Sequence, residues 1–119
     1  MNEIIAQLFA ARDIAHAIHL RTRSFSQHLA LGDFYEEIVD LADGLAETYS
    51  GKYGTLTIQP CQNPAVFAQT DAVAFIRSVA DWAEKVHSQL NPADSYIINQ
   101  WEEILALVYR AKYKLENLA

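Results

Sequence analysis

Apolar side chains recur at helical spacing along four stretches of the chain. Over residues 3–20 the apolar positions advance by four and three residues in turn, and the same rhythm returns over 25–50, 71–90 and 94–117. A period near 3.6 residues gives each stretch one apolar stripe, which predicts four amphipathic α-helices. Such helices bury their stripes against one another. We therefore expect an all-α four-helix bundle, with one domain over residues 1–119.

Local signals place the ends of these helices. Ser24 followed by Gln27 matches a capping box, so the second helix is expected to begin just after Ser24. Gly32 is a point at which this helix is expected to kink or break. The C-cap of the second helix and the N-caps of the third and fourth are expected at Gly51, Thr70 and Asp94.

Residues 51–69 join the second and third helices and contain four of the chain's seven Gly and Pro residues. Residues 53–58 have weak strand character but no second strand to pair with. An extended chain covers ~3.3 Å per residue, so this segment can run the length of a ~30 Å helix. The third helix can then run parallel to the second. One long crossover in a four-helix bundle describes a ferritin-like topology. The alternative is a simple up-down bundle with a floppy loop, and structureless loops of this length are uncommon.

The second stretch also carries an acidic stripe, nearly opposite its apolar one. Six carboxylates and no Lys or Arg lie between Arg23 and Lys52. Like charges four residues apart on a helix destabilise it by ~0.2–0.5 kcal/mol per pair. A cation, a histidine partner or water is therefore expected to offset the repulsion. The members of this acidic stripe are Glu36, Asp40, Asp43 and Glu47.

Composition narrows the class of protein. The net charge of −6 argues against DNA binding, which needs a basic patch. Cys61 is the only cysteine, which excludes an intramolecular disulfide and a Cys-type zinc site, and a cytoplasmic location is the expectation. No apolar run approaches the ~18 residues of a transmembrane helix, so no membrane partner is expected, and no signal peptide is visible.

Histidines and carboxylates in the first half of the chain suggest metal chemistry. Asp43 and Glu47 are four residues apart, so their carboxylates reach the same point in space. His16 lies on the preceding helix and His28 at the start of this one. Two carboxylates and two imidazoles can hold one or two ions of the iron type. His19 falls on the apolar seam of the first helix, where a hydrogen-bonded core histidine is expected.

These four candidate ligands resemble the ferroxidase motif of the Dps-like mini-ferritins, with intervals of 12, 15 and 4 residues along His16, His28, Asp43 and Glu47. The resemblance covers about residues 10–51. It implies a homo-oligomer in which the histidines of one subunit and the carboxylates of its two-fold mate share an iron site. Fe(II) oxidation is the implied activity, with no catalytic residue beyond the metal ligands. The family has a further acid four residues after the second histidine, where this chain has Gly32.

A second resemblance leaves the first histidine open. The stretch His-x8-His-x-Ala-Leu-Gly-x-Phe-Tyr, here His19 to Tyr35, is similar to short uncharacterised phage-type proteins. In that pattern His19, not His16, pairs with His28. The additional candidate ligands are therefore His19, Asp40 and Glu36.

A basic and aromatic cluster near the C-terminus supports a different function. Bases can stack on tyrosine while Arg and Lys meet phosphate. The alternative function is a non-enzymatic helical oligomer that binds a host protein or a nucleotide-like ligand. Such a cluster is also typical of a helix end with snorkelling side chains. The candidate ligand-binding residues are Tyr109, Arg110, Lys112 and Tyr113.

Three further residues are expected to have structural roles only. His87 is expected on the surface without an acidic partner. Trp82 and Trp101 are expected to anchor the core or an interface.

Overall fold

The computed structural model describes residues 1–119 and contains helices without any strand. This confirms the expected all-helical chain of four helices. Each helix begins and ends within three residues of the expected bounds. A short 3-10 turn, η1 (Pro64–Val66), interrupts the linker between the second and third helices. The four helices are α1 (Asn2–Arg21), α2 (Phe25–Tyr53), α3 (Ala72–Gln89) and α4 (Ser95–Asn117).

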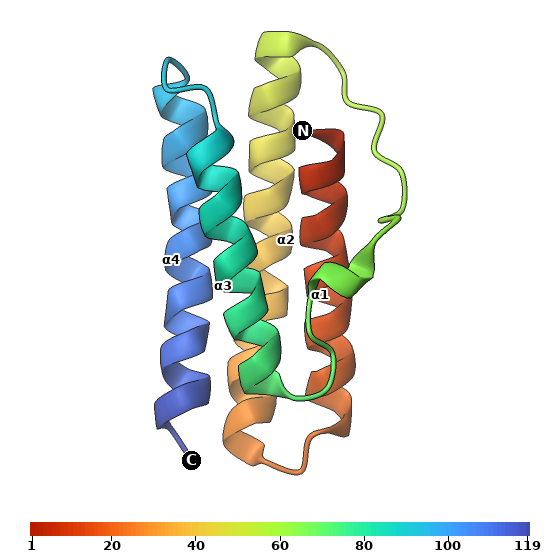
Figure 1. Cartoon of the computed structure of the whole chain (residues 1–119), viewed down its shortest axis with the longest axis vertical. Helices are drawn as coiled ribbons and strands as arrows, with labels where there is room; N and C mark the ends of the chain where they lie inside the picture. The colour runs from red at the N-terminus through yellow and green to blue at the C-terminus, as the bar shows by residue number, and fades with distance from the viewer.

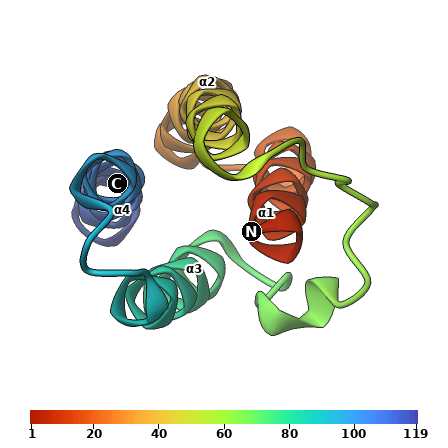
Figure 2. The ribbon, with the colours of Figure 1, turned by 90° about the horizontal axis from the view of Figure 1, so that it is seen from above.

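The helices stand at the corners of a square when the bundle is seen along its axis (Figure 2). α2 packs against α1 and α4, and α3 packs against α4 and less closely against α1. The linker, residues 54–71, leaves α2 at one end of the bundle, passes along the outside of α1 and reaches α3 at the other end (Figure 1). α3 therefore runs in the same direction as α2, while α1 and α4 run opposite to both.

A continuous apolar core fills the space between the helices. Trp101 is fully buried in this core and donates its indole N–H to the carbonyl of Ala83 at 2.9 Å, so its polar atom is satisfied. Phe67 comes from the linker and is also buried. Its ring packs edge-on against Phe75 and Trp82, with centroid distances of 6.4 and 5.3 Å. The core therefore holds the linker as well as the helices.

The N-terminal caps follow local hydrogen-bonding chemistry. Ser24 caps α2 as expected, because its hydroxyl accepts from the N–H of Gln27 at 3.3 Å. For α3 the expected cap was one residue wrong. Asp71, not Thr70, is the N-cap, and its carboxylate accepts from the N–H of Ala74 at 2.8 Å. A carboxylate at this position also favours the positive end of the helix dipole.

Two expected ends of helical structure in α2 were wrong. The helix runs through Gly32 without a break, and it packs against both α1 and α4. It also passes Gly51 and ends three residues later than expected. The C-cap is Gly54, whose φ of +101° lies in the region that glycine adopts at little steric cost.

Candidate metal centre

Two histidines from different helices stack face to face at the turn between α1 and α2. The ring centroids of His19 and His28 are 3.7 Å apart, with 17° between the ring planes. Nδ1–H of His19 donates to the carbonyl of His28 at 2.5 Å, and Nδ1–H of His28 donates to the carbonyl of His19 at 2.9 Å. A carbonyl only accepts, so both rings carry a proton on Nδ1. In the neutral imidazole, Nε2 then keeps its lone pair for a ligand.

Gly32 makes room for this histidine stack. A Cβ atom on Gly32 would lie 3.2 Å from Cε1 and 3.4 Å from Nδ1 of His19. Tyr35 follows on the same side of α2 and packs against His19 and His16, at centroid distances of 5.1 and 4.3 Å. The His16 ring lies 6.1 Å from that of His19. The structure thus places His19 directly against His28, while His16 joins the cluster through Tyr35.

The acidic stripe lies on the outward face of α2, and all four of its side chains are exposed without a hydrogen-bond or ion-pair partner in the chain. The two other carboxylates of this region have partners on α4. Lys114 Nζ is 3.6 Å from Asp33 Oδ2, and Arg110 Nη2 is 3.5 Å from Glu37 Oε2. The negative charge of the stripe is therefore left to solvent or to a partner outside the chain.

The histidines and the acidic stripe do not meet within one chain. Asp43 follows His28 by fifteen residues of continuous helix, which places the two residues about 22 Å apart along the axis of α2. No group of three or more His, Cys, Asp or Glu side chains is close enough to hold a metal ion. A metal site that uses both the histidines and the acidic stripe therefore needs a second copy of the chain.

The C-terminal cluster is divided among several neighbours. Arg110 faces α2 and pairs with Glu37, whereas Lys112 pairs with Glu116 at 3.0 Å. Glu116 also accepts from Arg77 Nε at 2.6 Å, which lowers the pKa of its carboxyl below the usual range, with a smaller effect from Lys112. The exposed Tyr109 and Tyr113 lie between the two cations on the helix surface. The four residues therefore do not converge on one point.

A buried carboxylate that was expected only as a cap joins α2 to α4. Asp94 stands at the N-cap of α4 but makes no capping hydrogen bond, and only 4 % of it is exposed. It accepts hydrogen bonds from Lys52 Nζ and the hydroxyl of Tyr53. These contacts lower the pKa of Asp94 and raise the pKa values of Lys52 and Tyr53. The Lys52 ammonium lies 5.2 Å from the ring centroids of both Tyr53 and Tyr96.

His87 is partly exposed, as expected for a surface residue, but the expectation that it lacks an acidic partner was wrong. Its Nε2 atom is 3.1 Å from Oε2 of Glu102 on α4. The pair lies across the α3–α4 contact. A contact between two helices cannot be predicted from the spacing of residues along either helix.

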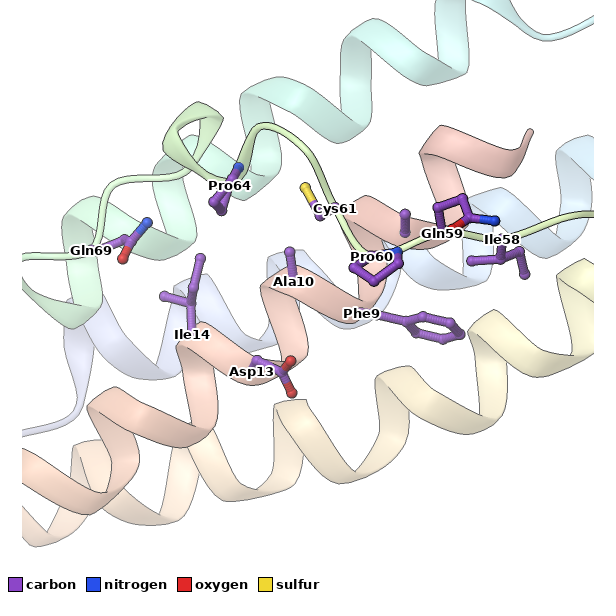
Figure 3. Close-up of a pocket in the computed structure, with 11 residues that line it drawn as sticks. Phe9, Ala10, Asp13, Ile14, Ile58, Gln59, Pro60, Cys61, Pro64 and Gln69 are labelled. Carbon is purple, nitrogen blue, oxygen red and sulfur yellow. The ribbon is translucent and has the colours of Figure 1, made fainter.

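A groove of about 640 Å³ lies between α1 and the linker (Figure 3). Phe9, Ala10 and Ile14 of α1 line one side, and Pro60 and Cys61 of the linker line the other. The groove is mostly apolar and holds no cluster of metal-ligating side chains. None of the histidines lines this groove, so it is separate from the histidine cluster.

Comparison with known families assigns the chain to one family, and that family has no known activity. A family of unknown function, DUF5856, matches residues 19–115, which is most of the chain. This chain is a DUF5856 protein. No curated protein and no solved structure matches it. The matched part of the DUF5856 chain includes His19, His28, Asp43 and Glu47, and begins after His16. No helix of this DUF5856 protein is both long and apolar enough to span a membrane.

Proposed function

We propose that this DUF5856 protein is a ferritin-like, homo-oligomeric protein that binds iron at a site shared by two copies of the chain. The observation that carries the proposal is the composition of the outward face of the α1–α2 hairpin. Histidines gather at one end of that face, and unpartnered carboxylates extend toward the other. The parallel course of α2 and α3, joined by one long linker, supports the ferritin-like topology.

The donor set suits iron. Carboxylate oxygens and imidazole nitrogens are its usual protein ligands in sites that leave positions open for a substrate. His28 would contribute Nε2, because its Nδ1–H is bound to a carbonyl. Asp43 and Glu47 would contribute carboxylates, with His16 as a further imidazole. Iron held by these residues would supply Fe(II)/Fe(III) redox chemistry, with dioxygen as the electron acceptor.

An antiparallel pair of α2 helices would bring the two ends of the hairpin face together. Two copies related by a two-fold axis present the same face to each other in opposite directions. With the axis between Glu36 and Glu37, His28 of one copy is level with Leu45 of the second copy. Leu45 lies between Asp43 and Glu47 along the helix, so each histidine end meets an acidic end. Two equivalent sites result.

The direct test measures iron retained per chain after anaerobic addition of Fe(II) and desalting. We expect the protein to retain iron and the Asp43→Asn/Glu47→Gln variant to lose it. These changes keep the side-chain shapes and remove the charge. The matched control is Asp81→Asn/Glu84→Gln, because these exposed acids of α3 lie one helical turn apart and are not part of the α1–α2 hairpin that carries His16 and His28. Unchanged iron retention in the Asp43/Glu47 variant would overturn the proposal.

A complementation experiment tests whether the site is shared. One inactive variant carries His16→Ala/His28→Ala, and the other carries Asp43→Asn/Glu47→Gln. Refolded together, half of the dimers are mixed, and each mixed dimer contains one intact site of two. About a quarter of the wild-type iron should therefore return. A site within one chain would give no recovery, because every chain in the mixture lacks half of the ligands.

A further inference from the structure

His28, in the first turn of α2, is held by a stacked ring and by a hydrogen bond. Its ring lies flat against the ring of His19, and its Nδ1–H donates to the carbonyl of His19. On the same ring, Phe25 stacks more distantly, at 6.4 Å and 18° between planes. Stacking fixes the plane of the ring, and the hydrogen bond fixes which nitrogen carries the proton. Together these contacts determine the direction in which the Nε2 lone pair points.

His19 is itself held in place from two sides. Its Nδ1–H donates to the carbonyl of His28, so the two residues restrain each other. Its ring edge rests over Gly32, where any side chain would press on Cε1 and Nδ1. The absence of a side chain at Gly32 therefore leaves room for the His19 ring, and the His19 ring in turn orients the ring of His28.

We infer that His19 and Gly32 are positioning residues for His28 as a metal ligand, and that His19 is not a ligand itself. This inference rests on the proposed iron site. A ligating imidazole generally donates its other N–H to a carbonyl or carboxylate, and such outer contacts change metal affinity by 10- to 100-fold. The histidine stack gives His28 this arrangement. It also explains why this chain has glycine at position 32, since a side chain there would displace His19.

The experiment compares four variants with the wild-type oligomer. Fe(II) affinity is measured by anaerobic titration calorimetry, and the proton position on the His28 ring is read from its ¹⁵N chemical shifts in the metal-free protein. His19→Ala removes the stacked ring and leaves the backbone carbonyl. His19→Phe keeps a flat ring and removes both ring nitrogens. Gly32→Ala presses on His19, and His87→Ala is the control at a histidine far from the α1–α2 turn.

Without the stacked ring of His19, the His28 imidazole can rotate away from the backbone carbonyl of residue 19 and lose its hydrogen bond. We therefore expect His19→Ala to weaken Fe(II) binding by about 10- to 100-fold and to give a mixture of His28 tautomers. His19→Phe should stay near the wild-type affinity. Gly32→Ala should weaken binding, and should add no further loss in a His19→Ala background, because the two residues act through one contact. His87→Ala should change neither measurement. Thermal unfolding of each variant confirms that it is folded.

The outcomes separate this inference from the proposed function. Equal losses in His19→Ala and His19→Phe would show that His19 ligates the metal, which overturns the positioning role and leaves the iron site intact. Unchanged Fe(II) affinity in both His19→Ala and Gly32→Ala would overturn the positioning role. The histidine stack would then only hold α1 against α2, and the iron site would again be intact. No Fe(II) binding by the wild type would overturn both.

Discussion

The two glycines inside α2 that were considered as possible helix ends have different surroundings. Gly32 and Gly51 both lie in α2, but Gly51 has no atom near the place where a Cβ would be, whereas Gly32 has the His19 ring at 3.2 Å. Glycine in a helix interior costs about 1 kcal/mol relative to alanine. The same substitution should therefore have opposite consequences at the two positions.

We expect Gly51→Ala to raise the free energy of unfolding by about 0.5–1 kcal/mol. Gly32→Ala should forfeit this gain and lower the stability, because the His19 ring is fixed by its hydrogen bond and its stack and cannot move away freely. His19→Ala should restore the gain at position 32. Urea unfolding of the three variants measures the effect. A Gly32→Ala protein as stable as Gly51→Ala would show that the histidine stack yields without cost.

Asp94 predicts a specific dependence of stability on pH. Lys52 and, more weakly, Tyr53 hold the pKa of the Asp94 carboxyl below its value in the unfolded chain. The native state is then favoured by this group above the unfolded pKa of ~3.9, and this contribution is lost as the pH falls through the lower native pKa. At the other extreme, the raised pKa values of Lys52 and Tyr53 imply that their contribution is complete below ~10 and is lost as the pH rises further.

Thermal unfolding of Asp94→Asn and of the wild type between pH 3 and pH 7 tests the predicted loss of stability at low pH. We expect Asp94→Asn to unfold at a lower temperature at pH 7, because it lacks the charge that binds Lys52. The gap should narrow below pH ~4, because Asp94 of the unfolded wild-type chain takes up a proton there while the native carboxyl does so only at lower pH. Glu103→Gln is the control, because this acid of α4 is exposed and has no ion-pair partner in the chain. A gap that stays constant over the whole range would contradict the assignment.

At the scale of elements, the linker has no α-helix or strand and only the short 3-10 turn η1. It is fastened to the bundle at several points along its length. Gln7 donates to the carbonyl of Asn63, the N–H of Thr57 donates to Asn2, and Arg21 donates to the carbonyl of Gln69. Only Phe67 among its side chains is fully buried. Polar contacts exposed to water contribute little each, so the aromatic anchor should account for most of the attachment.

Phe67→Ala should lower the free energy of unfolding by about 3–5 kcal/mol, the usual cost of removing a buried aromatic ring. It should also loosen the linker before the helices unfold. Hydrogen exchange would detect this as faster exchange of the N–H of Ala68, which donates to Ser78 Oγ in the wild type. Val66→Ala, at an exposed neighbour, is the control. Equal exchange at Ala68 in the two variants would contradict an anchoring role for Phe67.

The helices could be predicted from sequence because their apolar period is a local property, repeated over each element. The caps were predictable only to within a few residues, since Thr70 and Asp71 are both good capping residues and only the folded chain chooses between them. The contact between Lys52 and Asp94 joins residues from different helices. No spacing rule connects them. The histidine stack likewise needed the α1–α2 turn to be formed before His19 and His28 could be seen to face each other.

The carboxylates and histidines of the candidate site were visible in the sequence as residue types. Their relative placement was not. One continuous helix separates His28 from Asp43, so proximity in the list of ligands does not mean proximity in the fold. A set of ligands that works between two chains leaves no record in the contacts of one chain.

At the scale of the whole molecule, charge and apolar surface are unevenly placed along the hairpin of α1 and α2. The end near the turn carries Arg21, Arg23 and the histidines, together with exposed apolar side chains, while the acidic stripe extends toward the other end. Such a face is complementary to an inverted copy of itself. The exposed apolar side chains at the turn are Leu20, Phe25 and Leu29, with 71, 74 and 51 % of each exposed.

Association through this face should therefore depend on the apolar side chains of the turn. We expect Phe25→Ser/Leu29→Ser to shift the protein to monomers at micromolar concentration. Its unfolding temperature when fully dissociated should change little, because neither side chain is buried within the chain. Tyr109→Ser/Tyr113→Ser is the control, because these side chains are similarly exposed but lie on α4. Sedimentation velocity distinguishes the two variants. Loss of the oligomer only in the tyrosine variant would place the interface on α4, where no histidine meets a free carboxylate, and the shared iron site would then lose its structural basis.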